Sequence, residues 1–267
     1  MDSSFACNLC ELQGEPPKAQ TLHNHSQMTA AERLLLQQGT SGWTLSSLAA
    51  DSRDLEIREC RTTELLTWQD GHDQPIQKDR LLFSYRHSEA PQQFSEALVV
   101  SQIERAASAW SQCDIEARVI PIAQTKVGRD SITVQWDERE SRGNFALANL
   151  TNRTLSLSPK GFELLRSRNP QHDASQTLQM AISHEMGHFF GLMAHSRRCV
   201  DVMSYYHNGK GEVCYKRTPT ANSANNANKV VEYRHLLPTA CDIERCRRIN
   251  GKSPLPGGRL PQSPSAE

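Results

Sequence analysis

The segment HEMGHFFGLMAHS holds histidines and a glutamate at a spacing suited to metal-assisted chemistry. His184 and His188 lie four residues apart, so on a helix both imidazoles project from one face. This arrangement suits two nitrogens bound to one zinc ion at roughly 2.0–2.1 Å. Glu185 follows the first histidine and can accept a proton from a water molecule at the metal. Gly191 can end the helix and let His195 return as a third ligand.

The helix expected to carry this motif is otherwise apolar, which indicates a buried element. Ionisable side chains in a buried helix need a compensating partner, and zinc would supply one. The alternative is a polar surface helix with two stray histidines. Asp173, three residues before Gln176, is expected to cap the N-terminus of the helix. The apolar positions are Leu178, Ala181, Ile182, Met186, Phe189 and Phe190.

The motif resembles that of the metzincins, zinc peptidases with the pattern HExxHxxGxxH and a downstream turn that contains methionine. This chain has three residues, Leu192–Ala194, between Gly191 and His195, where the family pattern has two. We therefore expect a widened turn before His195. Ser196 and Met203 are similar to the matrixin branch, which implies that Met203 is the methionine of the Met-turn. The alternative for this methionine is ordinary core packing.

The resemblance implies a zinc-dependent endopeptidase, with Zn²⁺ held by the three histidines and a water molecule activated by Glu185. Tyr205 is similar in position to a tyrosine of astacin-like relatives, which implies a hydrogen bond to the tetrahedral intermediate. Alternatively, Tyr205 only packs the turn. Asp201 and His207 are the rival candidates for the third ligand. An extended peptide substrate is expected to add a strand along Phe145–Asn149.

Two other functions stay open. The residue inserted before His195 is compatible with a non-catalytic module that binds zinc or peptides on the same fold. Cysteines near the Met-turn and in the C-terminal helix are similar to those that bind a second zinc in archaemetzincin-like peptidases. However, Cys241 and Cys246 do not form a CxxC pair.

The order of the remaining elements is similar to that of a matrixin catalytic domain, which implies a metzincin-like α+β fold with a twisted mixed sheet, two long helices and a C-terminal helix. Alternating apolar and polar residues predict strands, and an apolar stripe at helical spacing predicts the first long helix. Thr151-Asn152-Arg153 is turn-like. The expected strands are Leu81–His87, Ile115–Ile122, Ser131–Trp136, Gly143–Leu150 and Thr154–Ser158, and the expected helices include Glu96–Gln112 and Thr239–Ile249.

The extent of the resemblance and the composition of the C-terminal stretch divide the chain into three parts. Residues 1–77 are expected to be a pro-segment or accessory region, with helical stretches at Thr29–Gln38 and Thr44–Ala50. Residues 78–252 form the expected catalytic domain. Residues 253–267 are rich in Pro, Gly and Ser and predict a disordered tail.

Cysteines and charge bear on location and partners. Cys199 and Cys214 are candidates for a disulfide, Cys7 and Cys10 form a lone CxxC, and Cys60 has a weak resemblance to an inhibitory thiolate of zinc peptidases.

The resemblance favours a secreted or extracellular protein, whereas MDSSFACNLC shows no signal peptide, so an intracellular location stays open. Thirty basic and thirty acidic residues give no support to nucleic-acid binding, and no stretch is apolar enough for a membrane span. The expected partner is a peptide or protein substrate.

Overall fold

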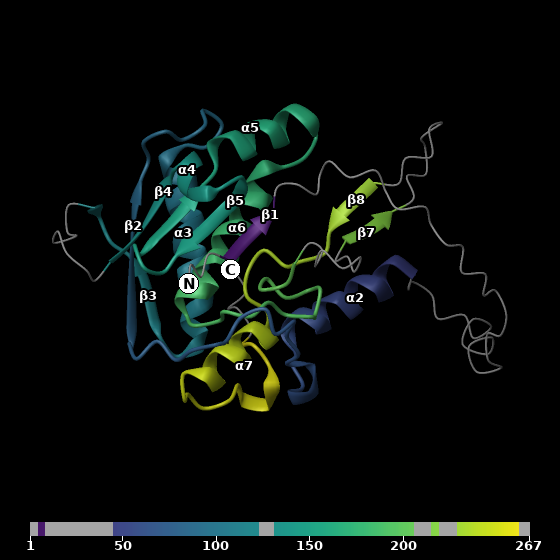
Figure 1. The fold of residues 1–267 in the computed structure, drawn as a ribbon. Helices are drawn as coiled ribbons and strands as arrows, with labels where there is room; N and C mark the ends of the chain where they lie inside the picture. Colours follow the sequence, from purple (N-terminus) through teal and green to yellow (C-terminus); the bar gives the residue numbers. More distant parts are fainter. Residues whose placement is uncertain (1–4, 9–44, 123–130, 206–214, 219–228, 262–267) are drawn as a thin grey trace, which may run out of the picture.

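The computed structural model describes residues 5–8, 45–122, 131–205, 215–218 and 229–261. Within these ranges a six-stranded sheet has the order β1-β5-β6-β4-β2-β3 (Figure 1). Parallel pairing joins β2 to β3 and β4, and β4 to β6, whereas β5 is antiparallel to both β6 and β1. The mixed sheet and the α+β class are as the sequence predicts. The strands are β1 (Phe5–Asn8), β2 (Arg80–Arg86), β3 (Glu116–Val119), β4 (Ser131–Trp136), β5 (Asn144–Asn149) and β6 (Thr154–Leu157).

Two long helices pack against each other and against the sheet. Helix α3 spans Glu96–Trp110, and α6 spans Ala174–Phe189. Shorter elements complete the described fold: α2 (Leu45–Arg58), α4 (Glu138–Ser141), α5 (Pro159–Arg168), α7 (Ala240–Ile249), the hairpin β7 (Tyr215–Thr218) and β8 (Lys229–Glu232), and the 3-10 turns at Thr62–Glu64, Ser111–Cys113 and Pro256–Gly258.

The core forms where the apolar positions of these elements meet. Strand β4 buries alternate residues, Ile132, Val134 and Trp136, as the period of a half-buried strand requires. Helix α3 begins at Ser95, whose hydroxyl accepts a hydrogen bond from the Leu98 amide at 3.2 Å. All six apolar positions predicted for α6 and its end are buried. Helix α6 therefore buries its apolar positions between α3 and strand β5.

Several boundaries differ from the sequence predictions. Helix α2 extends to Arg58, beyond the short element expected at Thr44–Ala50. Helix α5 was not predicted at all. The stretch Thr29–Gln38 lies outside the described residues.

The expected disordered tail is packed against the body of the protein as far as the structure describes it. Leu255 is buried, and its amide donates to the Glu244 carboxylate at 2.8 Å. Arg259 forms a β-bridge with Glu59, just after α2. Burial of one apolar side chain and these backbone bonds explain why the Pro, Gly and Ser content did not prevent order through residue 261.

Two disulfides attach α7 to distant parts of the chain. Cys60 pairs with Cys241, and Cys113, after α3, pairs with Cys246. Cys199 is also disulfide-bonded, whereas Cys214, its expected partner, lies outside the described residues. The Cys60 pairing corrects the thiolate expectation, because a sulfur in a disulfide cannot act as an inhibitory thiolate. The α7 cysteines are likewise not available for a second zinc.

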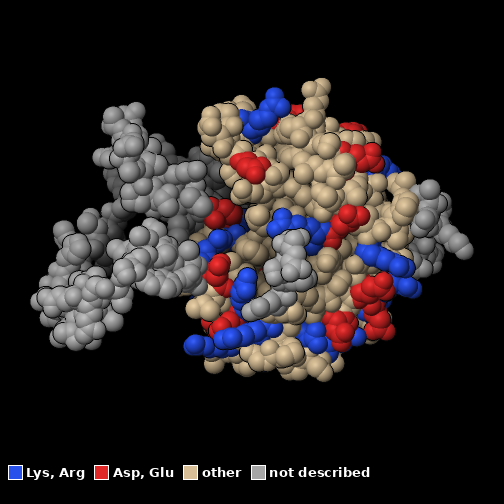
Figure 2. All heavy atoms as spheres, turned by 180° about the vertical axis from the view of Figure 1, so that it is seen from behind, with Lys and Arg blue, Asp and Glu red and all other residues tan. Residues whose placement is uncertain are grey.

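Among the described residues, no helix is both long and apolar enough to cross a membrane. On the face shown in Figure 2, described basic and acidic side chains are interspersed and do not separate into large regions of one sign. This distribution matches the balanced composition and offers no extended basic surface on that face.

Candidate metal centre

Helix α6 presents His184 and His188 on one face, as the sequence predicts. The helix begins after Asp173, whose carboxylate accepts the Ser175 amide at 3.0 Å. It ends at Phe189, and the chain turns at Gly191 with a φ of 95°. A Cβ on Gly191 would lie 2.1 Å from the Gln74 carbonyl oxygen. Both the backbone conformation and this close approach therefore require glycine at the turn.

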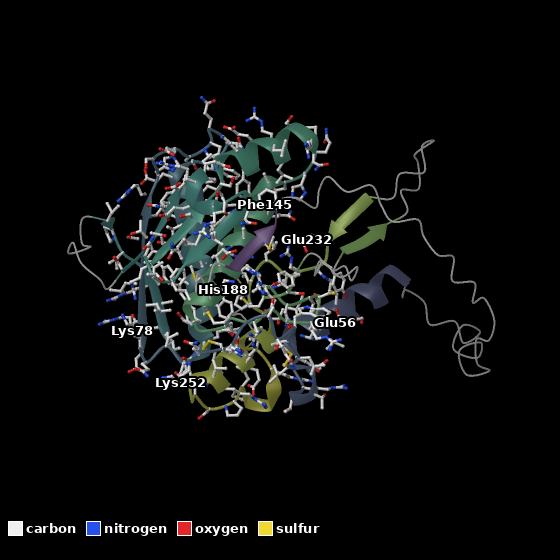
Figure 3. The ribbon with its side chains drawn as sticks, viewed as in Figure 1. Glu56, Lys78, Phe145, His188, Glu232 and Lys252 are labelled. Carbon is white, nitrogen blue, oxygen red and sulfur yellow. A yellow bond between two sulfur atoms is a disulfide. The ribbon has the colours of Figure 1, made fainter. Side chains whose placement is uncertain are left out.

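The turn returns His195 to the two helical histidines. One ligand atom from each of the three rings lies within 4.8 Å of the others. The Nε2 atoms of His184 and His195 are 3.2 Å apart, and all three residues are 1% exposed. Figure 3 labels His188, which lies in the interior of the ribbon in that view. The structure thus joins the three predicted metal ligands despite the inserted residue.

Hydrogen bonds fix the orientation of each imidazole. The Nδ1 atom lies 2.7 Å from the Val202 carbonyl in His184 and 2.7 Å from the Leu192 carbonyl in His188. In His195, Nδ1 lies 2.8 Å from the Asp70 carboxylate. Because a carbonyl oxygen only accepts, Nδ1 of His184 and His188 must carry the proton, and a carboxylate favours the same tautomer in His195. Each Nε2 then offers a lone pair.

This donor set fits a zinc ion. Burial lowers the pKa of all three histidines, with that of His188 lowered to about 3, so the rings are neutral at pH 7. Two unprotonated Nε2 atoms 3.2 Å apart repel each other unless a cation lies between them. Two nitrogens at roughly 2.0–2.1 Å from one tetrahedral zinc are about 3.3 Å apart, close to the separation seen here.

Glu185 lies beside the three histidines and is fully buried. Its Oε2 accepts the Ala148 amide of β5 at 2.8 Å and lies 4.0 Å from His188 Nε2. Within the described part of the chain, Oε1 has no hydrogen-bond partner. Burial raises the pKa of Glu185 well above its ordinary value, against the opposing effects of the Ala148 amide and Arg234. One oxygen is therefore held in place, and the other is left to interact with a small molecule.

Met203 packs against α6. It is fully buried, and a Cβ built on Gly187 would lie 2.3 Å from its sulfur. Gly187 lies between His184 and His188 in the sequence, so the methionine packs against the turn of α6 that joins these two histidines. The Met203 amide is 3.4 Å from the Asp242 carboxylate of α7, and its carbonyl accepts the Ser196 amide at 2.8 Å.

Tyr205 contacts the third histidine. Its ring stacks on His195 with a centroid separation of 3.9 Å and an interplanar angle of 20°. Its hydroxyl donates a hydrogen bond to the Asp70 carboxylate. In this conformation Tyr205 covers His195, and its hydroxyl is engaged by a carboxylate.

Of the rival ligands, Asp201 supports the turn after the metal centre. Its carboxylate accepts the hydroxyls of Ser196 and Thr239, each at 2.6 Å, and pairs with Arg198 at 3.1 Å. Burial raises its pKa despite these partners. It is not part of the histidine group. His207 lies outside the described residues.

Sequence reasoning missed two carboxylates that contact the turn before His195. Asp70 accepts the His195 amide and ring, and Asp73 accepts the amides of Met193 and Ala194. Burial raises the pKa of Asp70, but the hydrogen bonds from His195 and Tyr205 outweigh it and hold the pKa well below the usual range. Both residues lie more than 100 positions before the motif, and no local spacing connects them to it.

The strand expected to receive substrate is already paired on both sides. Strand β5 pairs with β6 on one side and with β1 on the other, where Phe5 lies opposite Ala148 and Ala6 lies opposite Leu147. In Figure 1 β1 lies beside β5. A segment of the chain itself therefore occupies the position that sequence reasoning gave to a peptide.

Comparisons with known proteins do not assign the chain. No family model matches it, and no curated protein matches it. A solved chain from the "GM1 bound form of the ECX AB5 holotoxin" is similar at 12% identity and a TM-score of 0.40, over 67% of this chain and 87% of that one. A likeness at this level supports no conclusion about function.

Proposed function

We propose that the protein is a zinc-dependent endopeptidase of the metzincin type, similar to the matrixins. The observation that carries the proposal is the grouping of three buried imidazoles whose Nδ1 atoms all have hydrogen-bond partners, which leaves their Nε2 atoms as the candidate ligands of one metal ion. Glu185 beside them supplies the base that such a reaction needs. The turn through Met203 beneath the helix is in keeping with the matrixin resemblance.

Zinc would be held by Nε2 of His184, His188 and His195. When bound, it would supply a Lewis acid that polarises a carbonyl and lowers the pKa of water. Glu185 accepts the proton of the attacking water at Oε1, while the Ala148 amide keeps Oε2 in place. The same carboxyl group then passes the proton to the leaving amine. Burial favours the protonated carboxyl and so makes the carboxylate a stronger proton acceptor.

The disulfides support an extracellular site of action. Cys60–Cys241 and Cys113–Cys246 are buried bonds that attach α7 to the rest of the fold. Such bonds form and persist in oxidising compartments.

The decisive test separates metal binding from hydrolysis. Glu185→Gln is expected to retain zinc and the fold but to lose peptide hydrolysis by at least about a hundredfold, the lower range for general acid–base catalysis. His188→Ala is expected to lose zinc and activity together. The measurements are metal content by mass spectrometry and cleavage of a peptide library. Cleavage by Glu185→Gln at the wild-type rate would exclude Glu185 as the base.

A non-catalytic zinc or peptide-binding module is the second candidate. It is favoured by the burial of the centre, where the three histidines and Glu185 are at most 1% exposed, and by the pairing of β5 with β1. Wild-type protein with one zinc per chain that cleaves no peptide in a broad library would favour this module over the peptidase.

A further inference from the structure

Residues Thr67–Gln74, here called the strap, run alongside the turn that carries His195. Thr67 forms a β-bridge with Ser196, and the Trp68 amide donates to the His195 carbonyl at 3.0 Å. At the other end, the Gln74 amide donates to the Gly191 carbonyl at 3.0 Å. The strap therefore contacts the turn from its first residue to its last.

The middle of the strap approaches the turn so closely that side chains are excluded there. A Cβ on Gly71 would lie 2.5 Å from the Met193 carbonyl oxygen. Close approach of the two backbones lets the carboxylates on either side of Gly71 reach consecutive amides of the turn. The inserted residue before His195 thus lies in a segment whose conformation is set by external contacts.

Asp73 binds the backbone of the widened turn. Its Oδ1 accepts the Met193 amide at 2.8 Å and the Ala194 amide at 3.0 Å. Arg245 of α7 donates to both oxygens of the same carboxylate, at 2.5 and 2.6 Å. Carboxylate–guanidinium pairs of this bidentate kind are geometrically specific. Asp73 therefore connects the turn to α7.

Asp70 binds the proposed metal ligand itself. Its Oδ1 accepts the His195 amide at 2.9 Å, and its Oδ2 accepts the ring Nδ1 proton at 2.8 Å. One carboxylate thus fixes both the backbone and the ring of one residue. A carboxylate bonded to the distal nitrogen of a metal-binding histidine orients the ring and strengthens it as a ligand.

We propose that Asp70 is a positioning residue for His195, which holds the ring in the Nδ1–H tautomer and so strengthens the binding of zinc by the three histidines. This inference rests on the zinc centre of the proposed function but not on hydrolysis. It explains how His195 reaches the other two ligands although it follows one residue later than the family pattern. The contacts with the strap fix the position of His195, which in a shorter turn would be fixed by the turn itself.

The experiment measures zinc affinity by competition with a chelator, in the full-length protein without substrate. Asp70→Asn is expected to weaken zinc binding about 10–100-fold, the usual effect of removing such a carboxylate. Tyr205→Phe, which removes the hydroxyl bonded to Asp70 but leaves the carboxylate, is expected to bind zinc nearly as wild type does. Asp79→Asn is the matched control, because its side chain is 95% exposed and pairs with Lys252.

A second readout follows the imidazole directly. Nitrogen NMR of metal-free protein is expected to show the His195 proton on Nδ1 in wild type and a shift towards Nε2 in Asp70→Asn. A role in folding alone would lower the unfolding temperature without moving this tautomer. Asp70→Glu, which retains a carboxylate on a longer side chain, is expected to bind zinc with an affinity between those of wild type and Asp70→Asn.

Wild-type zinc affinity in Asp70→Asn would overturn the inference. Absence of zinc binding by the wild type would overturn both this inference and the proposed peptidase. Tight zinc binding without peptide cleavage would contradict only the peptidase, so the two failures are distinguishable.

Discussion

Gly187 lies between the two helical histidines in a space that admits no side chain. A Cβ there would lie 2.7 Å from Trp110 Cζ2 as well as 2.3 Å from the Met203 sulfur. The methionine can bend away, but the indole cannot, because its nitrogen donates to the Ser183 carbonyl at 2.9 Å and its ring stacks on Phe190. The glycine therefore allows Trp110 of α3 and Met203 to pack against α6.

Gly187→Ala is expected to destabilise the protein, by about 1–3 kcal/mol as for other overpacked core positions. Helix propensity alone predicts the opposite sign, a gain of about 1 kcal/mol for alanine over glycine inside a helix. Chemical denaturation measures the difference, with Ser108→Ala at an exposed position of α3 as the control. A Gly187→Ala protein more stable than wild type would show that Trp110 is free to move.

At the residue scale, the sequence predicts the histidines and the glutamate of the candidate centre but not the residues that hydrogen-bond to them. His184, Glu185 and His188 share one helical turn, so their spacing alone places them together. His195 follows from the glycine and the short turn. Asp70 and Asp73 meet the same turn through tertiary folding, and aspartates in a polar segment have no feature that distinguishes them from surface residues.

The position of helix α7 depends on its hydrogen bonds, ion pairs and disulfides to other elements, because α7 is a short, mainly polar helix at the edge of the fold. Its Asp242 accepts the Val202 amide at 2.9 Å, and its Arg245 pairs with Asp73, so it contacts both sides of the metal centre. The two disulfides attach α7 to different parts of the chain. Cys113–Cys246 joins α7 to the end of α3, whereas Cys60–Cys241 joins it to the segment that leads into the strap.

Removal of either disulfide is expected to cost stability, typically about 2–4 kcal/mol. Only Cys60→Ala with Cys241→Ala is expected to weaken zinc binding as well, because it frees the start of the strap. Cys113→Ala with Cys246→Ala is the matched control. The measurements are denaturant unfolding and zinc competition for each double variant. Equal zinc affinities in the two variants would argue against a role for the Cys60 bond in the metal centre.

Helices and strands with a clear periodic pattern of apolar residues were predictable from the sequence, and the others were not. Strand β4 has the bounds expected from alternation, and α3 and α6 follow their apolar stripes. Helix α5 escaped prediction because it buries only Gly161, Phe162 and Leu165. Its start is instead fixed by Ser158, whose hydroxyl accepts the Gly161 amide at 2.8 Å. In α2, charged residues between Asp51 and Arg58 interrupt the apolar pattern from which a helix would be predicted.

For the whole molecule, the decisive long-range feature is the pairing of β1 with β5. The paired strand includes Ala148, whose amide binds Glu185 and which lies opposite Phe5. The first strand of the chain thus lies next to the base of the proposed reaction. Four residues without a strong alternating pattern give no hint of this partner more than 130 positions away, so sequence reasoning could not place them.

Phe5→Pro with Ala6→Pro is expected to accelerate cleavage of extended peptides by lowering KM. Successive amides of a strand point to opposite sides, so one of the two prolines removes an amide that faces β5. The measurement is the rate of peptide cleavage by full-length protein as substrate concentration varies. Ser3→Pro with Ser4→Pro, before the strand, is the control. An unchanged KM in the Phe5→Pro, Ala6→Pro variant would show that β1 does not compete with substrate.

Because β1 is covalently part of the protein to which it binds, its local concentration at β5 does not fall when the protein is diluted. A free peptide competes against this fixed effective concentration, and only its own concentration and affinity decide the outcome. Inhibition by β1 would therefore be intramolecular, and its extent would not depend on the concentration of the protein. A single cut between β1 and α2 would abolish that advantage, because the released strand would then have to bind as a separate molecule.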